Sequence, residues 1–354
     1  MVVVLCGWGE GLADGVFVPR RGSVRLDIHG PEQKAVIVHR NGEETLILSV
    51  KYAGALTDFA WVVPVASRPK VEKGDPEIFR ELAELTVESG PGAPGPPTAG
   101  LPGGDKTVQV LERRQVGVYD VAVLAAGDPN ALTYWLRHNG YALPGNPAAV
   151  LQHYVRKRWL YVAMRIDPRR TDEQSPSKGR SSIKKSLAEG TLHPLSLSFA
   201  SQTAVYPLRM TSLNPGKARI LLYVLAETKA EAEGFATRWA APLYVVPRDS
   251  VLSRVLRKAG FTEETPGTGG SPRPPSPTVC FLTKLEASLA PQQMKDDVVM
   301  TFTPSTSRQL GLPPLPAVRR QPEGRSRIPY EYIILGTVLC AVVLLLVLAF
   351  RRRR

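Results

Sequence analysis

The chain has 354 residues, of which 43% are hydrophobic and 22% are charged, a composition that excludes both an intrinsically disordered protein and one with many membrane spans. Its net charge of +13 favours contact with anionic partners such as lipid head groups or acidic wall polymers, although an ordinary basic, soluble surface explains it as well. The length permits one large domain or two smaller ones.

The N-terminal third of the chain predicts β-strands. Runs rich in β-branched residues indicate strands at 23–29, 34–40 and 44–52. The last two are joined by Asn41-Gly42, a pair that favours a tight hairpin because both turn positions tolerate a positive φ. The apolar run at 58–65 predicts a further, buried strand.

Three helices are predicted from openings in which Asp or Asn precedes a proline. These openings are Asp75-Pro76, Asp128-Pro129 and Asn146-Pro147. The Asp or Asn side chain can cap the helix, and proline suits its first position. Asn139-Gly140 is expected to end the second helix, and the cations at 156–158 suit the C-terminal end of the third.

Further strands are predicted along the rest of the chain, interrupted by loops rich in Pro and Gly at 90–104 and 262–277. These strands span 107–113, 116–125, 159–166, 195–200, 218–226, 242–246, 278–286 and 297–302. Many short strands with about three helices indicate a β-rich α+β fold, mainly of antiparallel sheet. One domain is expected at 16–304, with a division into lobes at 16–125 and 126–304 left open.

An apolar segment near the C-terminus predicts one transmembrane helix at 331–350. Residues 333–350 contain no charge and no proline, and as a helix they would extend roughly 27 Å, close to the hydrocarbon thickness of a bilayer. Six prolines from 304 to 329 indicate an extended tether at 305–330. The arginine tail at 351–354 favours a cytoplasmic C-terminus, which places the preceding domain outside the cytoplasm.

Export of that domain requires a signal, and the recorded start supplies only part of one. Residues 1–15 contain a short apolar run without a basic region before it. We expect this segment to be the remnant of an export signal followed by the start of the mature protein. The alternative is a tail-anchored protein whose domain stays in the cytoplasm.

The sequence contains no recognisable catalytic, cofactor or metal motif. Its five histidines lack the spacing of helical zinc sites, and neither a nucleophile elbow nor a complete phosphate-binding loop is present. We therefore expect no catalytic residue, no cofactor and no metal site. Asp296 and Asp297 are adjacent, and in a strand they would point to opposite faces, so they are not expected to act together on one substrate.

One basic stretch has the composition of an anion-binding surface. Residues 156–185 contain ten Lys or Arg and three acidic residues. The residues expected to contact lipid head groups or an acidic wall polymer are Arg156, Lys157, Arg158, Arg169, Arg170, Lys178, Arg180, Lys184 and Lys185. A solvated loop on a basic protein explains the same stretch. Nucleic acid is not expected as a partner, because no aromatic residues alternate with these charges in a strand.

The three cysteines exclude a disulfide framework. Cys340 lies in the apolar segment, which leaves Cys6 and Cys280 as the pair that could close one long loop. Two unrelated thiols are the alternative, and the sequence does not decide between them.

Short motifs follow one another along the chain. They are FAWVVPV at Phe59–Val65, Trp135-Leu136, Asn139-Gly140-Tyr141, Tyr154 with residues 159–163, His193-Pro194-Leu195, Tyr206-Pro207-Leu208-Arg209, Leu222-Tyr223-Val224 and Leu282-Thr283-Lys284-Leu285. In this order they resemble the bacterial family called domain of unknown function 2330, over about residues 6–302. The resemblance implies a secreted domain that often begins with Cys-Gly, as at Cys6-Gly7, and often ends in a membrane helix. It implies no activity.

The aromatic residues of these motifs are best explained as core, with a surface that stacks a ligand as the alternative. Together the observations favour a membrane-anchored, extracytoplasmic binding or structural module of the bacterial cell envelope. A cell-envelope hydrolase or transferase with an unrecognised active site is the second hypothesis. Protein partners, ligand and oligomeric state are not predicted.

Overall fold

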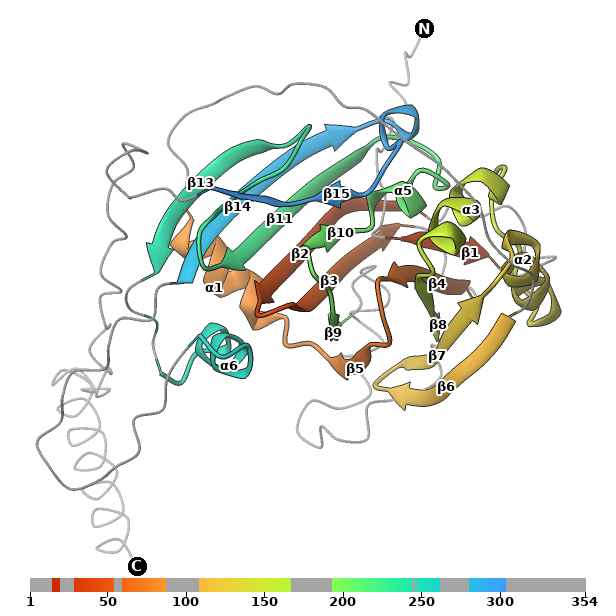
Figure 1. Ribbon diagram of the computed structural model, residues 1–354, viewed down its shortest axis with the longest axis horizontal. Coiled ribbons are helices and arrows are strands. Elements are labelled where there is room, and N and C mark those ends of the chain that lie inside the picture. The colour runs from red at the N-terminus through yellow and green to blue at the C-terminus, as the bar shows by residue number, and fades with distance from the viewer. Residues whose placement is uncertain are drawn as a thin grey trace, which may run out of the picture. The chain divides into compact units, whose positions relative to one another are not determined.

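The alternating and β-branched runs of the sequence assemble into two large sheets (Figure 1). The computed structural model describes residues 15–19, 29–53, 59–86, 108–166, 193–243, 246, 248–261 and 280–303. The five-stranded sheet is antiparallel throughout and has the order β1 (Val16–Pro19), β4 (Phe59–Val65), β8 (Leu160–Ile166), β7 (Tyr119–Ala126) and β6 (Val108–Val116).

The second sheet has seven strands, and its β11–β2 pair is parallel whereas the other pairs are antiparallel. Its order is β13 (Ala236–Leu243), β14 (Cys280–Leu289), β11 (Ala218–Ala226), β2 (His29–Arg40), β3 (Glu43–Ala53), β9 (Leu195–Ala200) and β5 (Lys70–Lys73). Two short antiparallel pairs accompany the sheets, namely β10 (Val205–Tyr206) with β15 (Val298–Val299) and β12 (Lys229–Glu231) with β16 (Thr301–Thr303).

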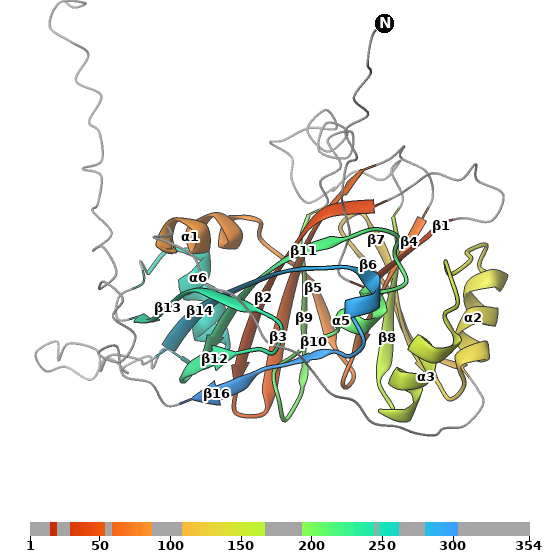
Figure 2. The same ribbon diagram turned by 90° about the horizontal axis from the view of Figure 1, so that it is seen from above.

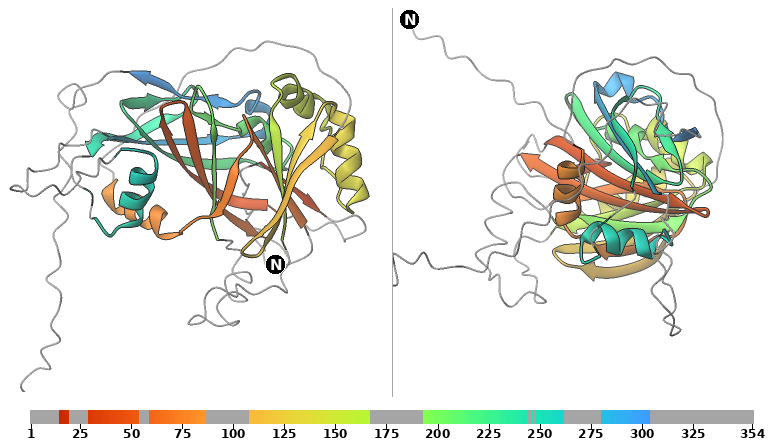
Figure 3. Two further views of the ribbon diagram at one scale, coloured as in Figure 1. Left: turned by 60° about the horizontal axis from the view of Figure 1, so that its bottom comes forward. Right: turned by 90° about the vertical axis from the view of Figure 1, so that its left-hand side faces the viewer.

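The helices cover the outer sides of the two sheets. They are α1 (Glu77–Leu85), α2 (Pro129–His138), α3 (Ala148–Arg156), α5 (Leu208–Thr211) and α6 (Val251–Lys258), with a 3₁₀ turn at Pro291–Gln293. Helices α1 and α6 pack on the seven-stranded sheet, whereas α2 and α3 pack on the five-stranded one. Figures 2 and 3 show these two pairs of helices beside different sheets.

A central hydrophobic core lies between the inner faces of the two sheets. Strand β4 shows how its sequence serves this arrangement, because all seven of its residues are buried. Every second residue from Phe59 to Val65 joins the central core, and the residues between them, Ala60 and Val62, face α2 and α3. A strand covered on both faces needs an apolar run rather than an alternating one, and FAWVVPV provides it.

The predicted β-rich α+β fold with mainly antiparallel sheet is confirmed, and the expected number of helices is wrong. The three Asx-Pro openings do lead into α1, α2 and α3, but the structure adds α5 and α6. The Asn41-Gly42 turn is also confirmed, with φ of 52° and 73° at its two residues. Both sheets take strands from either side of residue 125.

Several strand boundaries differ from the prediction. The strand expected at 242–246 lies earlier, at Ala236–Leu243, and the one expected at 297–302 is divided into β15 and β16. The strand expected at 23–29 lies outside the described residues except for its last residue, where β2 begins. None of the helices in the described part of the chain is long and apolar enough to cross a bilayer. The segments predicted at 305–330, 331–350 and 351–354 lie outside the described residues, as does the one predicted at 1–15 except for its last residue.

Candidate functional site

A cleft opens where the helices cease to cover the outer face of the five-stranded sheet. Its floor is formed by Ala60, Ala122 and Ala163 from the neighbouring strands β4, β7 and β8. Leu124 of β7 and Tyr161 of β8 are strand partners, each two positions away from the floor alanine of its own strand, and both pack under the helices. Because a methyl group fills far less space than these larger side chains, the change to alanine leaves room for a cleft at this end, although the alanines themselves stay 3–7% exposed.

Helix α2 forms one wall of the cleft, and the sequence fixes both of its ends. The Asp128 carboxylate accepts a hydrogen bond of 2.6 Å from a backbone N–H of the first turn. At the other end Gly140 adopts a φ of 91°, and the N–H groups of Gly140 and Tyr141 bond back to the last turn of the helix. This cap satisfies the terminal carbonyls and directs the buried Tyr141 into the core under α2.

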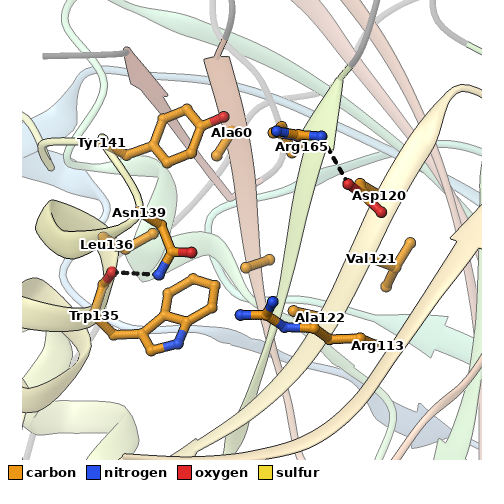
Figure 4. A pocket seen from close by; sticks show the side chains of 11 residues that line it. Ala60, Arg113, Asp120, Val121, Ala122, Trp135, Leu136, Asn139, Tyr141 and Arg165 are labelled. Carbon is orange, nitrogen blue, oxygen red and sulfur yellow. Dashed lines mark hydrogen bonds and ion pairs between the residues drawn. The ribbon is translucent and has the colours of Figure 1, made fainter. Parts of the chain in front are cut away.

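The end of α2 brings aromatic and amide side chains to the cleft (Figure 4). The Trp135 ring is half-buried and Asn139 is exposed. The amide nitrogen of Asn139 donates a hydrogen bond of 2.8 Å to the backbone oxygen of Trp135, and Figure 4 shows its amide oxygen turned towards the strands. The cleft therefore has an indole ring and a hydrogen-bond acceptor on its helical side.

The strands bring three charged side chains to the cleft, which encloses about 180 Å³. Arg165 of β8 donates a hydrogen bond of 2.9 Å to Asp120 of β7. Arg113 of β6 lies with its guanidinium carbon 5.9 Å from the centre of the Trp135 ring. Among the described residues Arg113 has neither a hydrogen bond nor an ion pair, so two arginines and one carboxylate leave the cleft with one net positive charge.

A second polar cluster is buried where α3, α5 and the bend before β15 meet. The Asp297 carboxylate, whose side chain is fully buried, accepts hydrogen bonds from His153 Nε2 at 2.9 Å and from the Tyr154 hydroxyl at 2.6 Å. It also accepts bonds from Lys157 Nζ at 3.1 Å and from the backbone N–H of Arg209 at 3.3 Å. Four donors therefore surround this carboxylate.

These donors determine the ionisation of Asp297. Burial by itself would raise the pKa of this carboxyl, but the hydrogen bond from His153 and the charge of Lys157 outweigh burial and hold the pKa below its ordinary value. The same cluster raises the pKa of the buried Tyr154, through burial first and the Asp297 charge second. Asp297 is therefore an ionised anchor that ties α3 and α5 to the chain before β15.

The cluster contains a histidine whose two ring nitrogens both have partners. His153 Nε2 contacts Asp297, while Nδ1 lies 3.2 Å from an Arg209 nitrogen and 3.5 Å from an Asp296 oxygen. The expectation that Asp296 and Asp297 serve opposite faces is thus wrong, because they lie in a bend rather than a strand and both approach this ring. Through these contacts His153 ties α3 to α5 and to the bend before β15.

Of the predicted anion-contacting residues, the structure describes three. Lys157 forms the ion pair with Asp297 and lies 5.0 Å from the Trp159 ring centre, and Arg158 is exposed with a φ of 57°. Arg156 has its Nε and Nη1 atoms buried without a hydrogen-bond partner in the described part of the chain. The other six lie outside the described residues, namely Arg169, Arg170, Lys178, Arg180, Lys184 and Lys185. Anion contact by this stretch stays a prediction.

Another buried carboxyl lies on the seven-stranded sheet. Glu44 of β3 is fully buried in the core face, where one oxygen accepts a hydrogen bond of 2.9 Å from the Val205 backbone and the other has no partner among the described residues. Burial raises the pKa of Glu44 to about 8, although the Val205 hydrogen bond opposes the shift. Glu44 is therefore mostly protonated at neutral pH.

The predicted disulfide stays untested. Cys280 is buried in the core under α1 and α6 and has no disulfide partner among the described residues, and Cys6 lies outside them. Burial raises the pKa of the Cys280 thiol well above its ordinary value, which makes it a poor nucleophile. Across the described residues, no group of three or more His, Cys, Asp or Glu side chains is placed to hold a metal ion.

The sequence motifs contain Trp135, Asn139 and Tyr141, and we interpreted the two aromatic rings as part of the core. Neither Arg113 nor Asp120 was identified as a site residue. The sequence gives only a weak indication that these residues meet in a cleft. Strand β7 changes from Leu124 to Ala122 on one face. Arg113 of β6 is the strand partner of Ala122, whereas Arg165 of β8 is the partner of Asp120. Only the strand order β8-β7-β6 shows that these residues meet.

Comparison with known proteins gives a family but no activity. No match was found among curated proteins. The crystal structure of baculovirus P35 resembles the chain with 11% identity and a TM-score of 0.36, over 82% of this chain and 100% of that one, a likeness too low to support an argument. The family model described as "Uncharacterized protein conserved in bacteria (DUF2330)" matches residues 15–298, and the chain therefore belongs to this bacterial family.

Proposed function

We propose that the chain is a membrane-anchored, extracytoplasmic binding module of the bacterial cell envelope, with the cleft beside α2 as its binding site for a small anionic ligand. One observation carries this proposal: Arg113 presents its guanidinium to the cleft without a carboxylate partner among the described residues. Small-molecule sites are mostly apolar with a few placed polar groups, and a guanidinium there can pair with an anionic ligand.

The anchoring part of the proposal rests on the sequence. The apolar segment at 331–350, followed by arginines at 351–354, supports a single-pass protein with its C-terminus in the cytoplasm. The tether at 305–330 would hold the domain away from the lipid surface, where an acidic wall polymer is within reach. The lipid bilayer is then a partner through the helix alone.

The cleft can be tested with the whole chain in detergent micelles. Small anions such as acetate and phosphate are added at constant ionic strength, with chloride as the reference, and the midpoint of thermal unfolding is measured. At least one anion is expected to raise the midpoint of the natural chain and of the control Arg137→Gln, but not of Arg113→Gln. Arg137 is an exposed residue of α2 outside the cleft, so its replacement removes the same charge. Equal shifts for the natural chain and Arg113→Gln with every anion would refute the proposed site.

An envelope hydrolase or transferase is the second hypothesis, and the described residues do not favour it. His153 has both ring nitrogens occupied, and Cys280 is buried with a raised thiol pKa. Probes that label active nucleophiles test this hypothesis, and covalent labelling of Ser181, Ser182 or Cys280 would support it.

A further inference from the structure

We propose that the cleft beside α2 binds a sugar ring that carries a single carboxylate, a proposal that rests on the proposed function and names its ligand class. The carboxylate would contact Arg113, and the ring would lie over the alanine floor next to Trp135. Three properties of the cleft support this ligand: its size, its mixture of polar groups and its charge.

The size and the floor suit one saturated ring. The cleft encloses about 180 Å³, below the roughly 300–1,000 Å³ of pockets that hold drug-sized ligands. Ala60, Ala122 and Ala163 form an apolar floor of which only 3–7% of each residue's surface is exposed. The half-buried Trp135 adds an indole ring at the side. A sugar ring has apolar C–H groups on its faces, so it can cover such a floor without leaving a polar group unpaired. An acyl chain would need a longer and deeper cavity.

The polar groups around the floor suit hydroxyls, which both donate and accept hydrogen bonds. The Asp120 carboxylate can only accept, and the amide oxygen of Asn139 is a second acceptor without a partner among the described residues. Arg113 can only donate. A sulfate ion offers acceptors alone, so it would leave the Asn139 oxygen unpaired, and it would meet the repulsion of the Asp120 carboxylate, which already accepts a hydrogen bond from Arg165. A ligand with hydroxyls as well as an anionic group uses all three residues.

The charge of the cleft suits a monoanion. Arg165 is paired with Asp120 at 2.9 Å, and Arg113 supplies the remaining positive charge. A guanidinium can form two parallel hydrogen bonds with one carboxylate, a geometry that lysine does not offer. A sugar with one carboxylate therefore matches both the charge and the fork of Arg113.

The test measures binding of four named sugars by titration calorimetry, with the whole chain in detergent micelles. D-Galacturonate and D-glucuronate are compared with their neutral parents, D-galactose and D-glucose, and with acetate. At least one uronate is expected to bind about tenfold or more tightly than both its neutral parent and acetate, because it gains a charge-assisted pair and keeps the ring contacts.

Variants locate the binding. Arg113→Gln should remove the preference for the uronate over its parent, Arg113→Lys should restore it only in part, and Arg137→Gln should leave it unchanged. Trp135→Leu should weaken the uronate and its parent alike. Because Arg113 is exposed, Arg113→Gln should keep the thermal midpoint of the natural chain, which separates lost binding from lost folding.

The outcomes separate this inference from the proposed function. If acetate binds as tightly as the uronates and depends on Arg113, the cleft binds anions and the sugar proposal is wrong. If no anion binds in an Arg113-dependent way, both proposals fail. The source of the sugar is tested with a galacturonate trimer: binding at least as tight as the monomer's indicates the end of an acidic polysaccharide, whereas binding of the monomer alone indicates a free sugar.

Discussion

The cleft beside α2 and the buried cluster around Asp297 lie against the same side of the five-stranded sheet and use similar residues, but they differ in how their charges are satisfied. In the cluster, one fully buried carboxylate has four donors from two parts of the chain, α3 with its C-cap and α5. In the cleft, the Arg165–Asp120 pair is partly exposed and Arg113 has no carboxylate partner among the described residues. Charged residues alone therefore do not identify a binding site. A cluster whose charges are all partnered stabilises the fold, whereas a cation without a partner can bind a ligand.

The largest expected effect comes from removing the carboxylate of the buried cluster. Asp297→Ala would leave the Lys157 cation and the buried donors His153 and Tyr154 without their acceptor beside a void, so the free energy of unfolding should fall by about 3–5 kcal/mol. Asp120→Ala in the cleft, where the ion pair is exposed to water, should cost about 1 kcal/mol or less. Denaturant unfolding of both variants measures the difference. Similar losses for the two would show that the regions do not differ as described.

The buried Glu44 sharpens the comparison, because it is as buried as Asp297 but has one donor instead of four. Its folded-state pKa of about 8 lies above the ordinary value of 4.5, so unfolding releases a proton between these pH values and stability falls as the pH rises. The stabilisation from protonated Glu44 is complete below pH 4.5 and is lost by about pH 8. Between these values the free energy of unfolding falls by about 1.4 kcal/mol per pH unit.

Glu44→Gln removes that proton while keeping an oxygen for the Val205 N–H. Between pH 6 and pH 7.5 the natural chain should therefore lose about 2 kcal/mol more stability than the variant. The lowered pKa of Asp297 acts in the opposite direction. Ionised Asp297 stabilises the fold at pH values above its pKa in the unfolded chain, and this stabilisation is lost as the pH falls through its pKa in the folded chain. Denaturant unfolding at several pH values tests both signs. Parallel pH profiles for the natural chain and Glu44→Gln would rule out a protonated Glu44.

The helices beside the two regions end in the same cap but with different residues. Gly140 follows α2 with a φ of 91°, whereas Arg158 holds the equivalent place after α3 with a φ of 57°. A left-handed backbone costs a residue with a Cβ about 1–2 kcal/mol, so Arg158→Gly should stabilise the fold by about 1 kcal/mol after the entropy of glycine is included. An unchanged or lower thermal midpoint would contradict this explanation of the cap.

The smallest effect on stability is expected in the cleft itself. Arg113→Gln should change the free energy of unfolding by less than about 0.5 kcal/mol, because the side chain is exposed and has no ion pair to lose in the described part of the chain. The same substitution should abolish anion binding. A large loss of stability would instead place Arg113 among the residues that hold the fold together.

Local features of the fold were predictable from the sequence because they depend on neighbouring residues. The Asn41-Gly42 turn and the three Asx-Pro helix starts follow from backbone preferences, and the strand at Phe59–Val65 follows from its apolar run. Helix α6 was missed although Ser250 caps it and Gly260 ends it, because its eight residues include several cations and form a short, hydrophilic segment.

The candidate sites depend on distant residues and could not be predicted in the same way. Asp297 and His153 are 144 positions apart, and no local pattern relates them. The cleft requires the strand order β4-β8-β7-β6, which brings together Ala60, Arg113 and Arg165 from three separate segments. The family motif at Asn139-Gly140-Tyr141 supplied the cap of α2, but its role as a cleft wall became visible only with the sheet beneath it.

The most direct test of the proposed site is a crystal structure of the chain grown with a saturating concentration of the uronate, D-galacturonate or D-glucuronate, that binds more tightly. The account predicts the sugar in the cleft beside α2, with its carboxylate against Arg113 and its ring over Ala122 and Ala163. An empty cleft at saturation, or a sugar bound elsewhere on the domain, would contradict it.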